Sequence, residues 1–186
     1  MIFARRGTNI EQYPAVLAHL QQYRERLEPR PRSWDGDEPW PGRKPGSYKW
    51  FEIQDEVAYF REFANPKIIY PDIAKESRFL LDTEGTFVSN TTYFMPTQDY
   101  FLLGVLNSAP MWNYCKRVLT VLGDAEKRGR LRFFTQDVLT LPIPHATAAQ
   151  RAAIAEISKE CSLRKGIGCK ALEDEIDRMV AELFGL

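Results

Sequence analysis

Residues 67–95 read KIIYPDIAKESRFLLDTEGTFVSNTTYFM, and this stretch decides the fold. It contains short runs rich in β-branched and aromatic residues, which is typical of β-strands. The connections between the runs are too short for crossover helices, so we expect antiparallel pairing. Asp82–Gly85 is predicted to connect two strands as a hairpin, with Gly85 suited to a left-handed backbone. Together with one run on either side, the predicted strands are Tyr48–Phe51, Lys67–Tyr70, Arg78–Leu81, Phe87–Val88, Thr91–Met95 and Leu131–Phe134.

Helices are expected on both sides of this stretch. Apolar residues spaced as one helical face predict an amphipathic helix over residues 10–27, after the capping candidates Thr8 and Asn9. A second helix is predicted over residues 98–118, and Pro110 should kink or split it. Residues 138–144 are predicted to be extended.

The C-terminal region predicts a helical hairpin. Thr147 is a capping candidate for a helix over residues 148–163, and a last helix follows Gly168 with apolar residues at i, i+3 and i+4 spacing. The fold class is therefore α+β, with a mostly antiparallel sheet flanked by helices. We expect one domain over residues 1–145 and the helical hairpin over residues 146–186.

Residues 29–47 are predicted to be a loop because prolines and glycines are dense there. Trp34 and Trp40 lie within it. They are either anchors that pin the loop to the body or exposed stacking platforms, and anchoring is favoured because an exposed Trp is unfavourable.

The composition excludes several classes of protein. The chain has 186 residues, of which 44% are hydrophobic and 27% are charged, so disorder over its whole length is excluded. No window approaches the roughly 18 uninterrupted apolar residues of a membrane span, so we expect a cytoplasmic protein without a membrane partner. The net charge is zero, but residues 101–150 hold six basic and three acidic residues. Such a segment suits limited contact with an anionic partner or is an ordinary solvated face.

No catalytic or metal-binding motif is found. The sequence lacks a phosphate-binding P-loop, a G-x-G-x-x-G turn and an H-E-x-x-H pair. Three cysteines without C-x-x-C spacing predict neither a disulfide framework nor a zinc site, and Cys115 is expected to be a buried, inert thiol. We therefore expect no catalytic residues, no metal and no cofactor in this chain.

Two groups of residues are candidates for contact with a nucleic acid. Uncharged polar side chains suited to base edges or sugar cluster in Ser89, Asn90, Thr91, Thr92 and Tyr93. Cations suited to phosphates are supplied by Lys67, Lys127, Arg128, Arg130 and Arg132. If residues 130–134 form a strand, Arg130 and Arg132 share one face while Leu131 and Phe133 face the core. The alternatives are a plain turn followed by an edge strand, and a solvated basic run.

Several blocks, read in order, resemble one known family. They are Tyr13–Ala15 with His19-Leu20 and Arg26-Leu27, Asn65–Ile73, Phe79–Asp82, Tyr100–Ser108, Leu139–Pro144 and Ile176–Leu186. This order is similar to the TaqI-like C-terminal specificity domain, the target-recognition region of adenine-specific DNA methyltransferases and fused type IIG restriction-modification enzymes. The resemblance covers most of the chain.

The resemblance implies a recognition module without its catalytic half. Family members carry an S-adenosylmethionine loop and an N-P-P-Y-like motif before this region, and neither occurs here. The implied partners are double-stranded DNA and a methyltransferase domain in cis or in trans, with S-adenosylmethionine bound by that domain. The chain is thus expected not to be an enzyme on its own. The alternative is a subunit-docking module of a restriction-modification or phage-defence system with little DNA contact.

Overall fold

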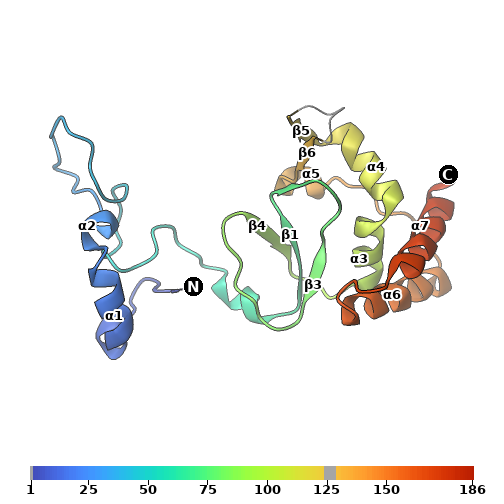
Figure 1. Cartoon of the computed structure of the whole chain (residues 1–186), viewed down its shortest axis with the longest axis horizontal. Coiled ribbons are helices and arrows are strands. Elements are labelled where there is room, and N and C mark those ends of the chain that lie inside the picture. The colour runs from blue at the N-terminus through green and yellow to red at the C-terminus, as the bar shows by residue number, and fades with distance from the viewer. Residues whose placement is uncertain (1, 124–128) are drawn as a thin grey trace. The chain divides into compact units, whose positions relative to one another are not determined.

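The computed structural model describes residues 2–123 and 129–186. Contacts divide the chain into two compact units, residues 1–60 and residues 61–186. This boundary differs from the predicted one at residue 145. The first unit holds η1 (Ile10–Gln12), α1 (Pro14–Gln21) and α2 (Arg24–Leu27), and η2 (Phe60–Ala64) spans the boundary (Figure 1).

The helix predicted over residues 10–27 consists of three short pieces instead of one. Asn9 caps η1, and Pro14, which has no N–H to continue the preceding turn, begins α1. No residue of α1 or α2 is fully buried. Because helices gain most of their stability from packing of one face, this half-exposed segment is not held as one continuous helix.

Residues 48–51 form a turn, so the predicted strand Tyr48–Phe51 is wrong. Arg43 explains why: its guanidinium donates to the carbonyls of Leu27 at 2.7 Å, Trp50 at 2.8 Å and Glu52 at 2.8 Å. These bonds hold the backbone in a turn, which the N–H of Glu52 closes by donating to the carbonyl of Lys49 at 2.9 Å, and a turn does not have the extended backbone of a strand. The predicted loop over residues 29–47 is confirmed, since it contains no helix or strand.

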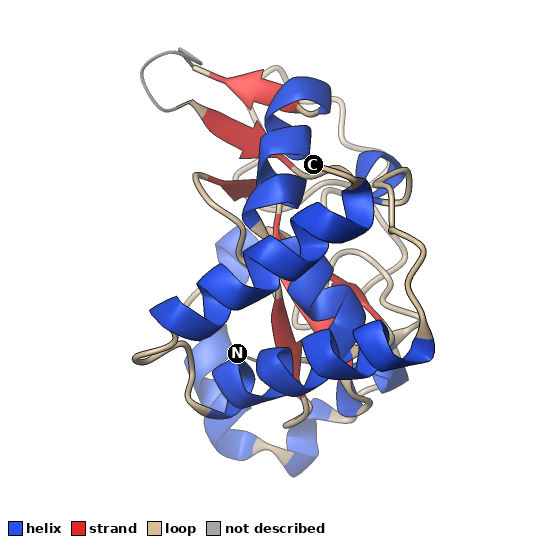
Figure 2. Cartoon of the chain, turned by 90° about the vertical axis from the view of Figure 1, so that its right-hand side faces the viewer, coloured by secondary structure: helices blue, strands red, loops and turns tan. Residues whose placement is uncertain are grey.

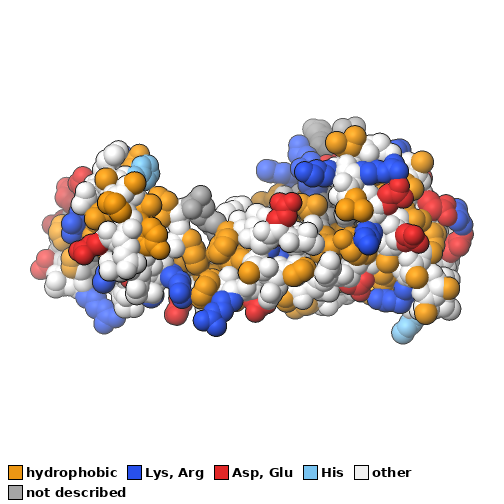
Figure 3. All heavy atoms as spheres, turned by 90° about the horizontal axis from the view of Figure 1, so that it is seen from below, with side chains coloured by type: hydrophobic (Ala, Val, Ile, Leu, Met, Phe, Trp, Pro, Cys, Tyr) orange, Lys and Arg blue, Asp and Glu red, His pale blue; other side chains and the backbone are white. Residues whose placement is uncertain are grey.

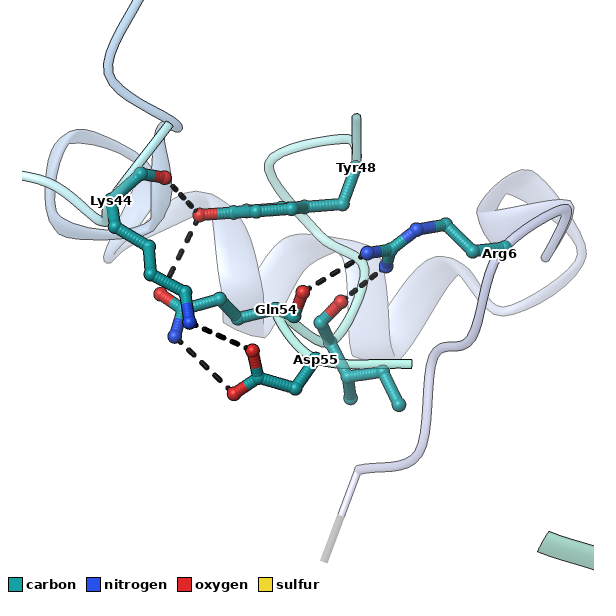
Figure 4. Close-up of polar contacts among 6 residues, drawn as sticks. Arg6, Lys44, Tyr48, Gln54 and Asp55 are labelled. Carbon is teal, nitrogen blue, oxygen red and sulfur yellow. Dashed lines mark hydrogen bonds and ion pairs between the residues drawn. The ribbon is translucent and has the colours of Figure 1, made fainter. Parts of the chain in front are cut away.

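The first unit is held together by further side-chain bonds to the backbone. Figure 4 shows Arg6 donating to the carbonyls of Ile53 and Gln54, and the Tyr48 hydroxyl donating to the carbonyl of Lys44. The Lys44 ammonium pairs with Asp55 at 2.8 Å. Tyr48 is buried under the guanidinium of Arg43, whose centre lies 4.5 Å from the ring centroid. Side chains of both polar and aromatic type thus order a segment that has little regular structure.

The second unit contains two three-stranded antiparallel sheets and five α-helices among its described residues. One sheet has the order β3-β1-β4, and the other has the order β2-β6-β5. The strands are β1 (Lys67–Pro71), β2 (Ile73–Ala74), β3 (Leu80–Asp82), β4 (Thr92–Met95), β5 (Thr120–Leu122) and β6 (Arg130–Arg132). The helices are α3 (Tyr100–Asn107), α4 (Ala109–Val118), α5 (Thr135–Val138), α6 (Ala148–Leu163) and α7 (Lys170–Phe184). The α+β class and the antiparallel pairing are confirmed.

Asp82–Gly85 does not connect a hairpin, and Phe87–Val88 is not a strand. Strands β3 and β4 lie on opposite sides of β1, so the segment between them crosses the end of the sheet. Asp82 shapes its start by accepting hydrogen bonds from the N–H groups of Glu84 at 3.1 Å and Thr86 at 2.9 Å. Gly85 has the left-handed backbone that the sequence predicted, with φ +74°.

Helices cover the sheets from one side, and Figure 2 shows α6 and α7 in front of the strands. The predicted C-terminal hairpin is confirmed, and Thr147 and Gln150 form a reciprocal capping box at the start of α6. The predicted split near Pro110 is also confirmed, because Ser108 ends α3 and caps α4. The extended segment is shorter than predicted, since Val138 ends α5.

Asn107 fastens the segment before β3 to helix α3. Its side chain accepts from the N–H of Phe79 at 3.0 Å and donates to the carbonyl of Phe79 at 2.8 Å. The next residue, Ser108, donates to the carbonyl of Val105 and accepts from the N–H of Met111. The pair Asn107-Ser108 therefore has a structural role within one of the blocks that carry the family resemblance.

Candidate nucleic-acid interface

The two sheets of the second unit meet at Asp72. β1 ends at Pro71 and β2 begins at Ile73, so Asp72 is the single residue between two strands of different sheets. Its N–H donates to the carbonyl of Thr91 at 2.9 Å, and its carbonyl accepts from the N–H of Phe133 at 2.8 Å. The backbone of Asp72 thus bonds to Thr91 in the polar turn, residues 89–92, and to Phe133, which directly follows the basic strand β6.

The side chain of Asp72 adds a further link to the basic strand. Its carboxylate pairs with the Nε of Arg132 at 3.3 Å. The guanidinium of Arg132 lies 4.4 Å from the ring centroid of Phe134, and its side chain keeps 37% of its surface exposed. Asp72 therefore neutralises part of this charge and fixes the direction of Arg132.

The polar turn presents its first three side chains to solvent. Ser89, Asn90 and Thr91 are exposed, and the hydroxyls of Ser89 and Thr91 lie 3.0 Å apart within hydrogen-bonding distance. The N–H of Thr92 donates to the carbonyl of Ser89 at 3.0 Å, which closes the turn. Hydroxyl and amide groups held on a closed turn suit hydrogen bonding to a polar surface.

Thr92 and Tyr93 are less available than the three residues before them. Both are half-buried in β4, where Thr92 is opposite Pro71 and Tyr93 is opposite Tyr70. The Tyr70 and Tyr93 rings have centroids 5.6 Å apart. Burial raises the pKa of the Tyr70 hydroxyl, although a hydrogen bond with Thr135 acts in the opposite direction.

The alternation predicted for the basic strand is confirmed. Arg130 is exposed, Arg132 is half-buried, and Leu131 and Phe133 are in the core with 2% of their surface exposed. In the register, Arg132 lies between Ile73 of β2 and Thr120 of β5. The outward face of this sheet thus carries the cations.

Lys67 does not face DNA, and its prediction as a phosphate contact is wrong. The side chain is fully buried, donates to the carbonyl of Phe63 at 2.7 Å and pairs with Asp82. Lys67 lies opposite Asp82 in the central strand β1, so its side chain has no solvent-facing side to occupy. Burial alone would raise the pKa of Asp82, but hydrogen bonds from Lys67, Glu84 and Thr86 lower it below its ordinary value.

Lys127 and Arg128, the other two predicted cations, lie outside the described residues. The sequence reasoning missed three exposed cations that lie along the chain beside β2 or β5, the two strands paired with β6: Lys75, Lys116 and Arg117. Lys75 directly follows β2, and the other two lie in the last turn of α4, just before β5. Their signal in the sequence was weak, since isolated cations at an element end are usually solvated or help to cap a helix.

We name the cations of this region the basic end: Lys75, Lys116, Arg117 and Arg130, which are exposed, and Arg132, which is half-buried. Figure 3 shows Lys and Arg side chains gathered at the upper edge of the second unit, on the right of the view. The acidic residues in this part of the fold include Asp72, which is already paired with Arg132. The basic end therefore carries a positive excess although the whole chain is neutral.

The described residues offer no metal or thiol chemistry beside this surface. No group of three or more His, Cys, Asp or Glu side chains suited to a metal ion occurs among residues 2–123 and 129–186. Burial raises the pKa of the Cys115 thiol to about 11, which keeps it protonated and unreactive. Within the same described ranges, no helix has the length and apolar character needed to cross a membrane.

Comparison with known proteins shows which family this chain belongs to. The family model described as TaqI-like C-terminal specificity domain matches residues 6–143, and the match ends shortly before α6. The chain is 26% identical over 197 aligned positions to the type II methyltransferase M.BanIII of Aneurinibacillus aneurinilyticus. The alignment covers 98% of this chain but spans only 30% of that relative. With most of its length matched by the family model, the chain belongs to the TaqI-like C-terminal specificity domain family.

Proposed function

We propose that this chain is the DNA sequence-recognition module of an adenine-specific DNA methyltransferase or of a fused type IIG restriction-modification enzyme. The observation that carries the proposal is the junction at Asp72, whose backbone bonds to both Thr91 and Phe133. It holds a turn of exposed hydrogen-bonding side chains beside a strand that presents cations. Phosphate contacts position a protein on DNA and base contacts specify the sequence, and the junction supplies side chains for both.

The family membership supports the same division of labour. A methyltransferase must extrude its target base into a pocket, while a second domain holds the duplex and reads the neighbouring bases. In this proposal the catalytic part lies in cis or in trans and binds S-adenosylmethionine, and the chain itself neither methylates nor cleaves DNA. The module would act in the cytoplasm, where it has access to cellular DNA.

Residues are proposed for two roles. Arg130, with Arg132 and the rest of the basic end, contacts phosphates. The exposed residues Ser89, Asn90 and Thr91 contact base edges or sugar, and Asn90 offers the amide that pairs bidentately with adenine. Thr92 and Tyr93, which are half-buried in β4, attach the turn to β1.

The test is a titration of fluorescently labelled duplex DNA with the full chain over a series of salt concentrations. We expect log affinity to fall linearly with log salt, and Arg130→Ala to make the slope less negative by about 0.9, the value of one phosphate contact. Asn90→Ala should instead change which duplex is preferred, by about 1–3 kcal/mol at one base pair. Lys159→Ala is the control, since Lys159 is an exposed cation on α6.

The alternative is a docking module for another subunit with little DNA contact. It is favoured by Leu163 and Ile167 at the turn between α6 and α7, which expose 74% and 78% of their surfaces. An affinity for duplex DNA that does not depend on salt would contradict the recognition proposal and favour docking. A slope equal for Arg130→Ala and wild type would contradict the role given to Arg130.

A further inference from the structure

A second basic surface lies in the first unit, in the loop that the sequence left without a role. Residues 28–32 and residues 46–51 form the two walls of a cleft of about 510 Å³. A smaller cleft of about 300 Å³ adjoins it, and both are lined by Arg30, Pro31, Arg32 and Gly46. Together they form a groove, which we name the Arg30 groove.

The walls of the groove are fixed by backbone bonds that do not involve its charged side chains. The N–H of Arg43 donates to the carbonyl of Glu28 at 3.0 Å, and the N–H of Arg30 donates to the carbonyl of Arg43 at 2.9 Å. The guanidinium of Arg43 donates to the carbonyl of Leu27, which directly precedes the first wall, and to the carbonyl of Trp50 in the second wall. Trp40 anchors the loop by donating its indole N–H to the carbonyl of Glu28 at 3.0 Å.

Three cations line this fixed groove, and the ammonium of one of them, Lys49, lies 5.7 Å from the ring centroid of Phe51. Arg30, Arg32 and Lys49 are exposed, and within the part of the chain that the structure describes none of them forms an ion pair. The acidic lining residue of the larger cleft, Glu28, is paired with Arg24 at 3.3 Å. The groove is thus electrostatically prepared for an anion.

Aromatic rings lie along the groove on either side of the arginines. Trp50 and Phe51 line the larger cleft and meet edge to face, with centroids 5.7 Å apart. Trp34 lines the smaller cleft and exposes 40% of its surface. Proteins that track single-stranded nucleic acid interleave cations with aromatic rings, because phosphates meet the cations and bases stack on the rings. Along a duplex, whose bases are paired, the same rings would meet the sugars of the backbone.

We propose that the Arg30 groove binds the sugar-phosphate backbone of DNA and is a contact separate from the basic end. The inference rests on the proposed function, since it adds a second contact to the same DNA ligand. Two adjoining clefts that share Arg30 and Arg32 suit an extended polyanion better than a compact one. Between polyanions, the exposed ring of Trp34 favours a nucleic acid over an acidic peptide, while the ring of Trp50 already carries the guanidinium of Arg24 at 4.9 Å from its centroid.

The experiment compares the full chain with the double variant Arg30→Ala/Arg32→Ala, using a labelled duplex of arbitrary sequence. Two lost phosphate contacts should make the slope of log affinity against log salt less negative by about 1.8. At about 0.1 M salt each lost contact lowers affinity about eightfold, so the double variant should bind roughly 60-fold more weakly. Circular dichroism checks that the variant is folded.

The matched control is Arg26→Ala/Lys44→Ala, which removes the same charge from the same unit at exposed residues outside both clefts. It should bind within about twofold of wild type, because screening at this salt concentration weakens distant charges. An equal loss in both double variants would overturn the groove and leave only a net-charge effect. Polyglutamate that displaces the duplex as well as unlabelled DNA does would also overturn it.

Arg130→Ala distinguishes this inference from the proposed function. Weaker binding by Arg130→Ala together with unchanged binding by Arg30→Ala/Arg32→Ala overturns the groove and supports the proposed interface. The reverse pattern supports the groove and contradicts the role given to Arg130. Wild-type protein that shows no salt-dependent binding to duplex DNA overturns both.

Discussion

The substitution Asp82→Asn should strongly destabilise the second unit. One oxygen of Asp82 accepts from the N–H of Glu84 and the hydroxyl of Thr86, and the other accepts from Lys67 and from the N–H of Thr86. If the first oxygen becomes the amide nitrogen of Asn, the N–H of Glu84 faces a donor, and if the second does, both Lys67 and the N–H of Thr86 face one. Lys67 also keeps a buried charge without its counter-ion.

The expected loss follows from this geometry. Breaking a buried pair by removing one partner costs about 3–5 kcal/mol, a large share of the 5–15 kcal/mol by which domains are stable. Lys67→Met should cost less, about 1–3 kcal/mol, because Asp82 keeps the three hydrogen bonds from its own loop and the carbonyl of Phe63 loses one donor. The order of the two losses is therefore part of the prediction.

Urea unfolding followed by far-ultraviolet circular dichroism measures both variants. Asp55→Asn is the matched control, since it removes a carboxylate with 74% of its side chain exposed, and its urea midpoint should stay close to that of wild type. If Asp82→Asn unfolds within 1 kcal/mol of wild type, or if Lys67→Met is the more damaging change, Asp82 does not organise the loop as described.

Three more outcomes are expected. Gly104→Ala should destabilise the protein by about 1–3 kcal/mol despite the better helix propensity of Ala, because the new Cβ would lie 2.3 Å from the Oγ of Ser158. Adding Ser158→Ala to this variant should recover part of the loss, as measured by thermal unfolding. Asn107→Ala should speed hydrogen exchange at the amide of Phe79, which loses its acceptor, and unchanged exchange would contradict the role of Asn107. The pKa of Asp82 is lower in the folded than in the unfolded protein. The contribution of Asp82 to stability should therefore be complete above about pH 4 and be lost as pH falls through the folded pKa. Urea midpoints measured across this pH range should fall less steeply with decreasing pH in Lys67→Met than in wild type.

Elements with local signals could be predicted from the sequence. The helix after Thr147 and the break between α3 and α4 follow from side chains within one turn of the element ends. The alternation Arg130, Leu131, Arg132 was correct because a strand with one buried face has a strict period of two.

Features that depend on long-range pairing could not be predicted. β1 is the central strand, with buried residues on both of its faces, and the sequence does not reveal that Lys67 lies opposite Asp82. The sequence of residues 82–85 predicts a hairpin turn, but in the structure Asp82 from this segment pairs with Lys67. Likewise, Arg43 bonds to the carbonyls of Lys49 and Trp50 and holds the backbone of the predicted strand Tyr48–Phe51 in a turn.

If the proposed interface is correct, the junction at Asp72 lets the side chains that contact bases vary while the backbone that positions them stays in place. Its links to Thr91 and Phe133 run through backbone atoms, so they do not depend on which side chains those two positions carry. The turn at residues 89–91 is exposed and is closed by a backbone bond between Thr92 and Ser89. Substitutions at Ser89 or Asn90 therefore alter what the turn presents while its position relative to the basic strand is kept. A specificity domain needs this separation, because the grip on phosphates must stay in register while the side chains that read bases vary.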